Sequence, residues 1–128
     1  MLSVWLILIV TPRLVGMQDR NSLHEPKPAI VLCDGDDGLT SRFCDAVENA
    51  FRRSPDFKLK TQLTPSILKV TIPTNLHWKR VGGKTQAIYA IEFSSADDQK
   101  IGDANGSCRE DQLNICANQV LRRAREIR

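Results

Sequence analysis

The feature that most constrains this chain is a set of four cysteines that follows an apolar run near the N-terminus. The apolar run covers residues 4–10. The cysteines are Cys33, Cys44, Cys108 and Cys116. An even number of cysteines in a small exported chain is typical of a fold stabilised by disulfides. The sequence therefore predicts a periplasmic or secreted protein with two disulfide bonds.

The apolar run is too short to cross a membrane as a helix, because such a helix needs about 20 apolar residues. Pro12 and Arg13 interrupt the run. Its length fits the apolar part of a signal peptide, although no Lys or Arg precedes it and residues 14–17 are a poor cleavage site. An uncleaved anchor and an ordinary structural segment are the alternatives. We expect a signal peptide at residues 1–17, a flexible segment at residues 18–28 and a single domain without a membrane span at residues 29–128.

The charge balance does not favour a nucleic-acid partner. The chain has 18 Lys and Arg against 15 Asp and Glu, a net charge of +3, and Arg13 would leave with a cleaved leader. Several arginines crowd the C-terminus: Arg122, Arg123, Arg125 and Arg128. Cations at the end of a helix complement its dipole. We therefore interpret this basic end as stabilising a helix and predict no nucleic-acid binding.

Hydrophobic periodicity predicts a strand followed by a helix at the start of the domain. Residues 29–33 are an apolar run, as expected of a central strand that is covered on both faces. Residues 34–38, rich in Asp and Gly, form a turn cluster. Apolar residues then recur at helical spacing over residues 38–53. Pro55 ends the helix, because the residue before a proline avoids helical backbone angles.

Alternating patterns predict strands in the middle of the chain. Apolar and polar residues alternate over residues 57–63 and again over residues 68–72. The segments 76–81 and 85–94 flank a Gly-Gly-Lys sequence, which is typical of a tight hairpin turn. Pro73 belongs at an edge, at a bulge or in the gap between two short strands, because it cannot donate to a sheet ladder.

The C-terminal segment predicts a second helix. Residues 107–110 match a capping box, and an apolar stripe runs from Leu113 to Ile127. The predicted fold is α+β, a two-layer sandwich in the order β-α-β-β-β-α with two helices on one face of a mixed sheet of four or five short strands. This order is similar in outline to small periplasmic domains of envelope-assembly and transport accessory proteins, such as the amino-terminal domain of TolB. The likeness lies in the topology, and no residue motif carries it.

Helix geometry limits the disulfide pairing. If Cys108 lay in the first turn of the last helix, the rise per residue would place it about 12 Å from Cys116, too far for a disulfide. Either Cys108 lies in the loop before that helix, or the pairs are long-range. We favour Cys33 with Cys44 and Cys108 with Cys116, because a helix that doubles back on a strand end brings the first two together. Ser107 is then a loop residue instead of a helix cap.

Metal and thiol chemistry are not favoured by the spacing. The cysteines lack the C-x-x-C pattern of zinc sites and redox motifs. Four carboxylates near the first turn could bind Ca²⁺: Asp34, Asp36, Asp37 and Asp45. Leu39, however, occupies the place of the invariant glycine of calcium loops. We therefore expect Asp36 or Asp37 to cap the first helix, and we predict no metal and no cofactor.

The tripeptide Asn105-Gly106-Ser107 has two interpretations. In a eukaryotic secreted protein it would be an N-glycosylation site. In a bacterial protein it would be an Asn-Gly turn before the last helix, and this is the interpretation we favour.

The predicted hairpin provides the candidate binding residues Trp78, Arg80 and His77. Trp and Arg are common anchors of protein interfaces. The alternative for Trp78 is that it covers the core. His77 is the only plausible base for a serine triad, but a histidine beside an aromatic residue on a strand is more typical of packing or of the surface. We predict no catalytic residues.

We expect a noncatalytic, exported interaction domain that binds another envelope protein through an edge or the wet face of its sheet. A second hypothesis is a secreted inhibitor or ligand-binding protein that inserts the hairpin at residues 76–94 into a target cleft. A third is a small hydrolase that uses His77. The sequence does not determine the oligomeric state or the identity of the partner.

Overall fold

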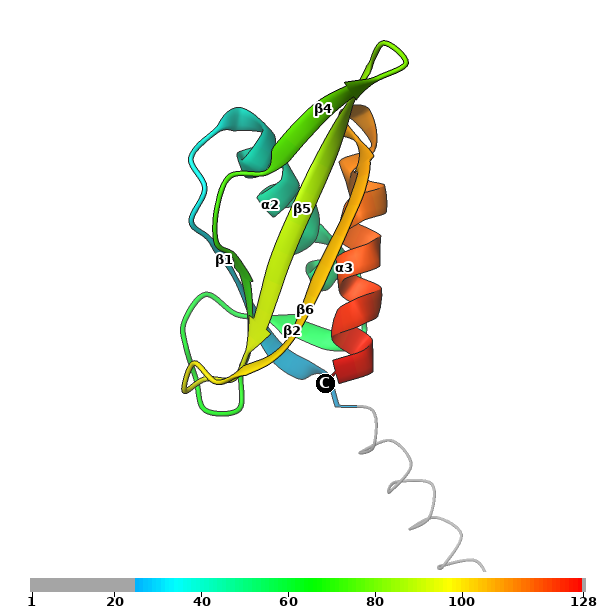
Figure 1. Cartoon of the computed structure of the whole chain (residues 1–128). Helices are drawn as coiled ribbons and strands as arrows, with labels where there is room; N and C mark the ends of the chain where they lie inside the picture. The colour runs from blue at the N-terminus through cyan, green and yellow to red at the C-terminus, as the bar shows by residue number, and fades with distance from the viewer. Residues whose placement is uncertain (1–24, 128) are drawn as a thin grey trace, which may run out of the picture.

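The computed structural model of the chain describes residues 25–127, so the predicted signal peptide at residues 1–17 lies outside the described residues. The described part forms six strands and two α-helices (Figure 1). In chain order the elements are β1 (Lys27–Cys33), α2 (Gly38–Arg53), β2 (Phe57–Leu59), β3 (Leu68–Ile72), β4 (His77–Val81), β5 (Lys84–Ser94), β6 (Lys100–Arg109), the short 3₁₀ helix η1 (Glu110–Gln112) and α3 (Leu113–Ile127). β1 thus begins within the segment 18–28 that we expected to precede the domain.

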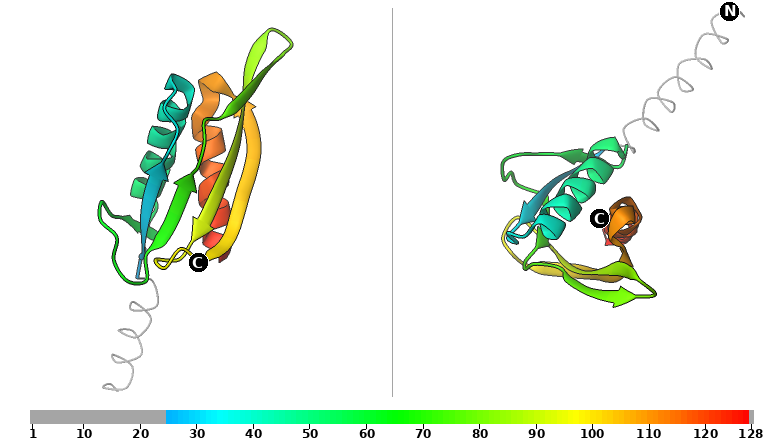
Figure 2. Two further views of the ribbon diagram at one scale, coloured as in Figure 1. Left: turned by 60° about the vertical axis from the view of Figure 1, so that its left-hand side comes forward. Right: turned by 90° about the horizontal axis from the view of Figure 1, so that it is seen from above.

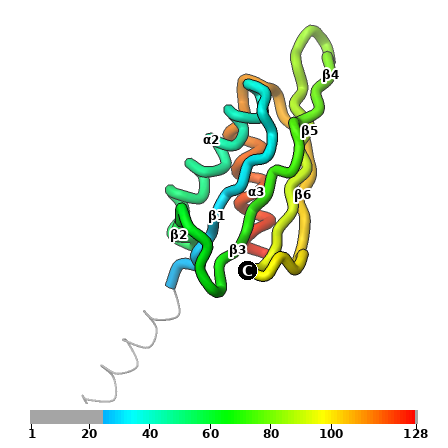
Figure 3. The backbone as a smooth tube through the Cα atoms, turned by 90° about the vertical axis from the view of Figure 1, so that its left-hand side faces the viewer, coloured from blue at the N-terminus to red at the C-terminus, as the bar shows by residue number. Residues whose placement is uncertain are grey.

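All six strands belong to one mixed sheet. β1 pairs in parallel with β2 on one side and with β3 on the other. β5 is the longest strand and pairs antiparallel with three others. β6 lies along one side of β5, whereas β3 and β4 follow one another along its other side (Figure 3). The predicted mixed sheet is confirmed, with one strand more than the upper limit of the prediction.

Both helices cover the same face of the sheet, as predicted (Figure 2). They pack on each other and bury a common core with the inward side chains of β1, β3 and β5. The largest fully buried side chains include Phe43 and Phe51 of α2 and Phe93 of β5. The ring of Phe43 stacks on that of Tyr89, with 5.3 Å between their centroids. The exposed parts of the molecule project from this core.

The predictions for the first helix and for the hairpin are confirmed. α2 has the predicted bounds, residues 38–53, and it is amphipathic. β4 and β5 form a hairpin through a two-residue turn in which Gly82 and Gly83 have φ of +57° and +77°. These angles are strained for residues with a Cβ, which explains the paired glycines. Pro73 lies in the gap between β3 and β4, one of the three places predicted for it.

Both favoured disulfides are present. Cys33 bonds to Cys44 and Cys108 bonds to Cys116, with Cα–Cα distances of 6.3 and 5.8 Å. Each bond joins the carboxyl end of a strand to the helix that follows it, β1 to α2 and β6 to α3. Because both strands run toward the same end of the molecule, the two disulfides stabilise the end from which the hairpin projects (Figure 1).

The predicted strand over residues 57–63 is too long. β2 ends at Leu59, and Leu63 is 58% exposed in the connection that follows. The reason is topological, because β2 and β3 lie on opposite sides of β1. The chain must leave the sheet after Leu59 to cross from one side of β1 to the other. An alternating pattern does not show where such a crossing begins.

The largest correction concerns residues 100–109. We expected an Asn-Gly turn at residues 105–106 and Ser107 in the loop that follows it, but residues 100–109 form the ten-residue strand β6. Pairing with β5 overrides the poor strand propensity of Gly, Asp and Asn. The residues of β6 that face the helices are small, which lets α3 lie close to the strand. They are Gly102, Ala104, Gly106 and Cys108.

Candidate functional site: the β4–β5 hairpin

The β4–β5 hairpin extends past the ends of both helices (Figures 1 and 2). All five residues of β4 are exposed. The hairpin carries four of the basic or potentially basic side chains of this end of the molecule: His77, Lys79, Arg80 and Lys84. A strand that is exposed along its whole length contributes little to a core. This hairpin is therefore the surface that the fold leaves open for contacts with other molecules.

Strand register divides the three predicted binding residues between two faces. Trp78 lies opposite Ala87, which is buried on the face that the helices cover, and Arg80 lies opposite Thr85. Residues directly opposite in an antiparallel pair project from the same face. Trp78 and Arg80 therefore share the helix-side face of the hairpin, while His77, opposite Ile88, lies on the other face.

Trp78 is 62% exposed, so the alternative that it covers the core is wrong. Val81, at the tip of the same strand, is 52% exposed. Because successive residues of a strand point to opposite faces, Val81 projects from the face opposite to Trp78, and each face of the hairpin carries one exposed apolar side chain.

Arg80 fastens the turn of the hairpin. Its Nη1 donates to Thr85 Oγ1 and its Nη2 donates to the Gly83 carbonyl, both at 2.8 Å. The guanidinium thus closes a ring between the two strands while it remains exposed. This contact was not predicted from the sequence. The two hydrogen bonds restrict the conformation of the turn.

His77 is not assembled into a catalytic group within the described residues. Within residues 25–127, its imidazole forms no hydrogen bond with a carboxylate or with a nucleophilic side chain. No group of three or more His, Cys, Asp or Glu side chains in the same residues is arranged to hold a metal ion. His77 is an exposed side chain on the outer face of the hairpin.

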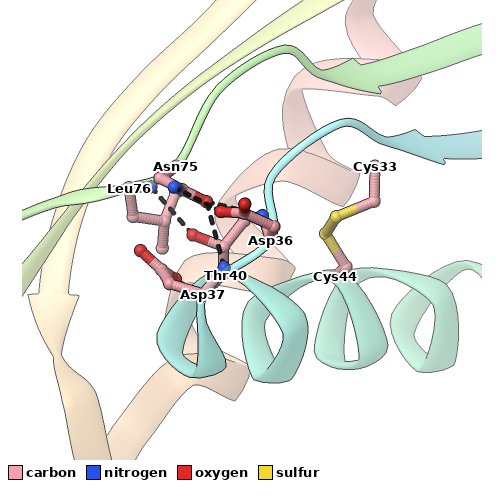
Figure 4. Close-up of a disulfide and its surroundings, with 7 residues drawn as sticks. All are labelled: Cys33, Asp36, Asp37, Thr40, Cys44, Asn75 and Leu76. Atoms are coloured by element: carbon pink, nitrogen blue, oxygen red, sulfur yellow. Dashed lines mark hydrogen bonds between the residues drawn. A yellow bond between two sulfur atoms is a disulfide. The ribbon is translucent and has the colours of Figure 1, made fainter.

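The base of the hairpin is bound to the start of α2 (Figure 4). Asn75 Oδ1 accepts from the backbone N–H groups of Asp36 and Asp37 at 2.7 and 3.2 Å. Asn75 Nδ2 donates to Asp36 Oδ1 at 2.9 Å, and Leu76 N donates to Thr40 Oγ1 at 2.9 Å. We call this set of contacts the Asn75 brace. It fixes the direction in which β4 leaves the core.

The acidic turn before α2 serves this brace and caps the helix. Asp37 is the N-cap residue, and its Oδ1 accepts from Thr40 N at 2.7 Å. Hydrogen bonding to the Thr40 side chain, and then to its backbone N–H, holds the pKa of the Asp37 carboxyl below its ordinary value. The predicted capping role is therefore confirmed. Gly35 allows the close approach, because a Cβ there would lie 2.5 Å from Thr40 Cγ2 and 2.6 Å from Asn75 Oδ1.

A shallow hollow lies where the hairpin meets η1. It measures about 170 Å³. Its lining comes from the hairpin and from the start of the C-terminal helical segment: Arg80, Gly83, Lys84, Thr85, Arg109, Glu110 and Asp111. Sites for small ligands are usually clefts of about 300 to 1,000 Å³. The hairpin surface is therefore better suited to a macromolecular partner than to a small molecule.

Known proteins provide structural neighbours but no family. No family model and no curated protein match the chain. A minor lipoprotein from Acinetobacter baumannii aligns with a TM-score of 0.50 and 8% identity, covering 77% of this chain and 91% of the other. The protein XCC0632 from Xanthomonas campestris, described by the family model DUF330, aligns with a TM-score of 0.51 and 9% identity, covering 74% and 83%.

At these identities the likeness concerns the fold alone. A PelC dodecamer from Paraburkholderia phytofirmans aligns over 73% of this chain and 82% of its own, with 12% identity and a TM-score of 0.47. That score is too low to support an inference about this chain. None of the helices within residues 25–127 has the length and apolar character needed to cross a membrane. The two-layer α+β sandwich is thus shared with proteins from Acinetobacter and Xanthomonas.

Proposed function

We propose that this chain is an exported, noncatalytic interaction domain that binds another protein of the cell envelope through the β4–β5 hairpin. The observation that carries the proposal is the complete exposure of β4, with Trp78 62% exposed, on a hairpin held by the Asn75 brace. Each of the other five strands contains at least one buried residue.

The extracytoplasmic location is supported by two observations. The four cysteines are paired in two disulfides, and structural disulfides persist in oxidising compartments such as the periplasm or the exterior. A protein with a similar fold is described as a minor lipoprotein. Together with the leader-like residues 4–10, these observations favour an envelope protein.

The hairpin has the physical properties of an interface anchor. Trp side chains are enriched among residues whose truncation costs more than about 2 kcal/mol of binding energy. The Asn75 brace and the Arg80 contacts hold the hairpin in one conformation before binding. A preorganised element loses less conformational entropy on binding than a loose loop. The basic side chains around Trp78 favour a partner with an acidic rim around an apolar pocket.

Photo-crosslinking in the native host tests the proposal. A photoreactive amino acid replaces Val81 at the hairpin tip in the full chain, and a matched variant carries it at Leu63, which is similarly exposed but lies outside the hairpin. We expect an adduct with one envelope protein from position 81 and none from position 63. Adding Trp78→Ala should lower the yield of the adduct about tenfold or more.

Two results would contradict the proposal. Equal labelling of the same proteins from both positions would show that the hairpin has no specific partner. An adduct that persists at full yield in the Trp78→Ala variant would show that Trp78 does not anchor the partner. An adduct with a soluble secreted enzyme would instead favour the inhibitor hypothesis, in which the hairpin enters a target cleft.

A further inference from the structure

A second surface, separate from the hairpin, lies between the outer edge of β6 and α3. It is a groove of about 580 Å³. One wall consists of five consecutive residues of β6, from Asp103 to Ser107, and the other is one face of α3. The α3 residues follow helical spacing: Gln119, Arg122, Arg123 and Glu126. The groove therefore runs along a strand and a helix that lie side by side (Figure 1).

The floor of the groove is polar and fixed. Tyr89 Oη donates to Gln119 Oε1 at 2.9 Å. Burial raises the pKa of the Tyr89 hydroxyl, so this group remains a donor at neutral pH. A Cβ at position 106 would lie 2.8 Å from Tyr89 Oη and 3.0 Å from Gln119 Oε1, so Gly106 leaves the room that this contact requires.

Two observations show which backbone groups of β6 face the groove. Arg123 Nε donates to the Asp103 carbonyl at 3.0 Å, so that carbonyl points away from β5 and toward α3. The two-residue turn of the hairpin makes Val81 and Lys84 a hydrogen-bonded pair. Along β5, the backbone groups of Lys84 and of every second residue after it therefore form hydrogen bonds on the side of β4 and β3. The backbone groups of the residues between them form hydrogen bonds with β6.

Both observations agree on which residues of β6 direct their backbone groups away from β5. The backbone groups of Asp103, Asn105 and Ser107 therefore point away from β5 at the open edge of the sheet, because the register with β5 is regular from Gly102 to Arg109. Among these groups, the Asp103 carbonyl alone has a hydrogen-bond partner within residues 25–127, which is Arg123. Unpaired N–H and C=O groups in a row are a template for an additional strand.

The charges of the groove leave one cation uncompensated. Arg123 Nη1 lies 3.3 Å from Glu126 Oε2, and Lys100 Nζ lies 3.4 Å from Asp103 Oδ2. Arg122 is exposed and makes no hydrogen bond or ion pair with any other residue in the range 25–127. A carboxylate of a bound partner would give Arg122 an ion pair of the kind that the four other ionised groups already form in two pairs.

We infer that this groove binds an extended, acidic segment of a partner protein as a seventh strand of the sheet. The segment pairs with the backbone of Asn105 and Ser107 and places an Asp or Glu side chain on Arg122. Five strand residues span about 17 Å, which is the length of a short added strand. The groove volume lies in the range of pockets that enclose a bound ligand. Backbone pairing supplies affinity, and the Arg122 contact selects for the acidic side chain.

A peptide library displayed on phage and selected against the protein with both disulfides formed provides the probe. We expect selected heptapeptides to contain Asp or Glu at one position and no internal proline. For a synthetic copy, Arg122→Ala should weaken binding about tenfold. Arg52→Ala on α2, an exposed arginine outside the groove, should leave binding unchanged.

The strand-like mode of binding has its own test. Asn105→Pro removes an N–H that points out of the sheet, so it should leave the β5–β6 pairing and the fold intact while it abolishes peptide binding. If this variant does not fold, peptides N-methylated at alternate backbone amides decide the matter. Methylation on the edge that faces β6 should abolish binding, and methylation of the other amides should not.

Three results would overturn the inference. The library could return no peptide that distinguishes the natural protein from Arg122→Ala. Peptides could bind equally well after methylation of either set of amides. The protein alone could form a concentration-dependent dimer that Asn105→Pro abolishes, which would show that a second copy covers the edge. None of these results bears on the hairpin, so the proposed function would stand or fall separately.

Discussion

β3 and β4 pair with successive parts of the same side of β5, yet they have opposite environments. The inward residues Leu68, Val70 and Ile72 of β3 are at most 1% exposed. Every residue of β4 is exposed. The helices cover β3, whereas the hairpin that contains β4 extends past the ends of both helices (Figure 2). Strand pairing alone therefore does not make a core strand, because burial depends on the layer that packs above it.

The same contrast assigns different tasks to the two strands. Side chains on β3 stabilise the fold by removing apolar surface from water. Side chains on β4 have no such role and are free to contact another molecule. The gap from Pro73 to Leu76, with the Asn75 brace inside it, separates the two environments. Substitutions on either side of this gap should therefore differ in kind as well as in size.

The largest expected effect is the loss of a buried side chain on β3. Ile72→Ala should lower the free energy of unfolding by about 3 kcal/mol, because it removes buried methyl groups and leaves a cavity. Val81→Ala on β4 is the matched control and should change it by less than about 0.5 kcal/mol. Urea unfolding at neutral pH measures both. Similar losses in the two variants would contradict the division between covered and uncovered strands.

The disulfides should have the next largest effect. Replacing both cysteines of either pair with alanine should destabilise the protein by about 2 to 3 kcal/mol, as expected for sequence separations of 11 and 8 residues. Unfolding in urea with and without reductant provides the comparison. If reduction left the unfolding midpoint of the natural protein unchanged, the disulfides would not stabilise the hairpin end.

Thr40→Val tests the Asn75 brace at the boundary between the two strands. Thr40 is fully buried, and the substitution keeps its shape but removes the acceptor for Leu76 N. A buried N–H left without a partner should cost about 1 to 3 kcal/mol. Amide exchange at Leu76 and along β4 should accelerate more than exchange along β3. The control is Ser41→Ala on the exposed side of α2, and equal acceleration in both strands would contradict a local brace.

The smallest effect concerns pH. The carboxylate of Asp37 stabilises the fold above the pKa it has when unfolded, about 4, and this stabilisation is lost as the pH falls through its lower pKa in the folded protein. Asp37→Asn keeps a capping oxygen without the titration. Between pH 7 and pH 3, the natural protein should therefore lose stability relative to the variant. Parallel stability curves would contradict the linkage.

Local sequence signals predicted most of the covered region. The spacing of Leu39, Phe43 and Val47 gives α2, and the glycine pair gives the hairpin turn. The Cys33–Cys44 disulfide could be predicted because it joins a strand end to the next helix, whereas Cys108, expected in a loop, lies in β6. Trp78 and Arg80 were predicted as candidate binding residues, and the strand register places both on the helix-side face of the hairpin.

The missed features depend on contacts between distant residues. β6 is rich in Gly, Asp and Asn, and it becomes a strand because β5 and α3 hold it. The small residues at every second position, from Gly102 to Cys108, were the signal that could have revealed it. Asn75 reaches Asp36 across 39 positions, which no local pattern encodes. Leu63 continued an alternation past the point where topology required the strand to end.

A paired measurement on Trp78→Ala tests the central claim most directly. The unfolding free energy and the yield of the position-81 photo-adduct are determined on the same variant. We predict a change in stability below about 0.5 kcal/mol together with a loss of adduct of about tenfold or more. A large loss of stability with an unchanged adduct would show that Trp78 belongs to the core and that β4 is not the recognition strand.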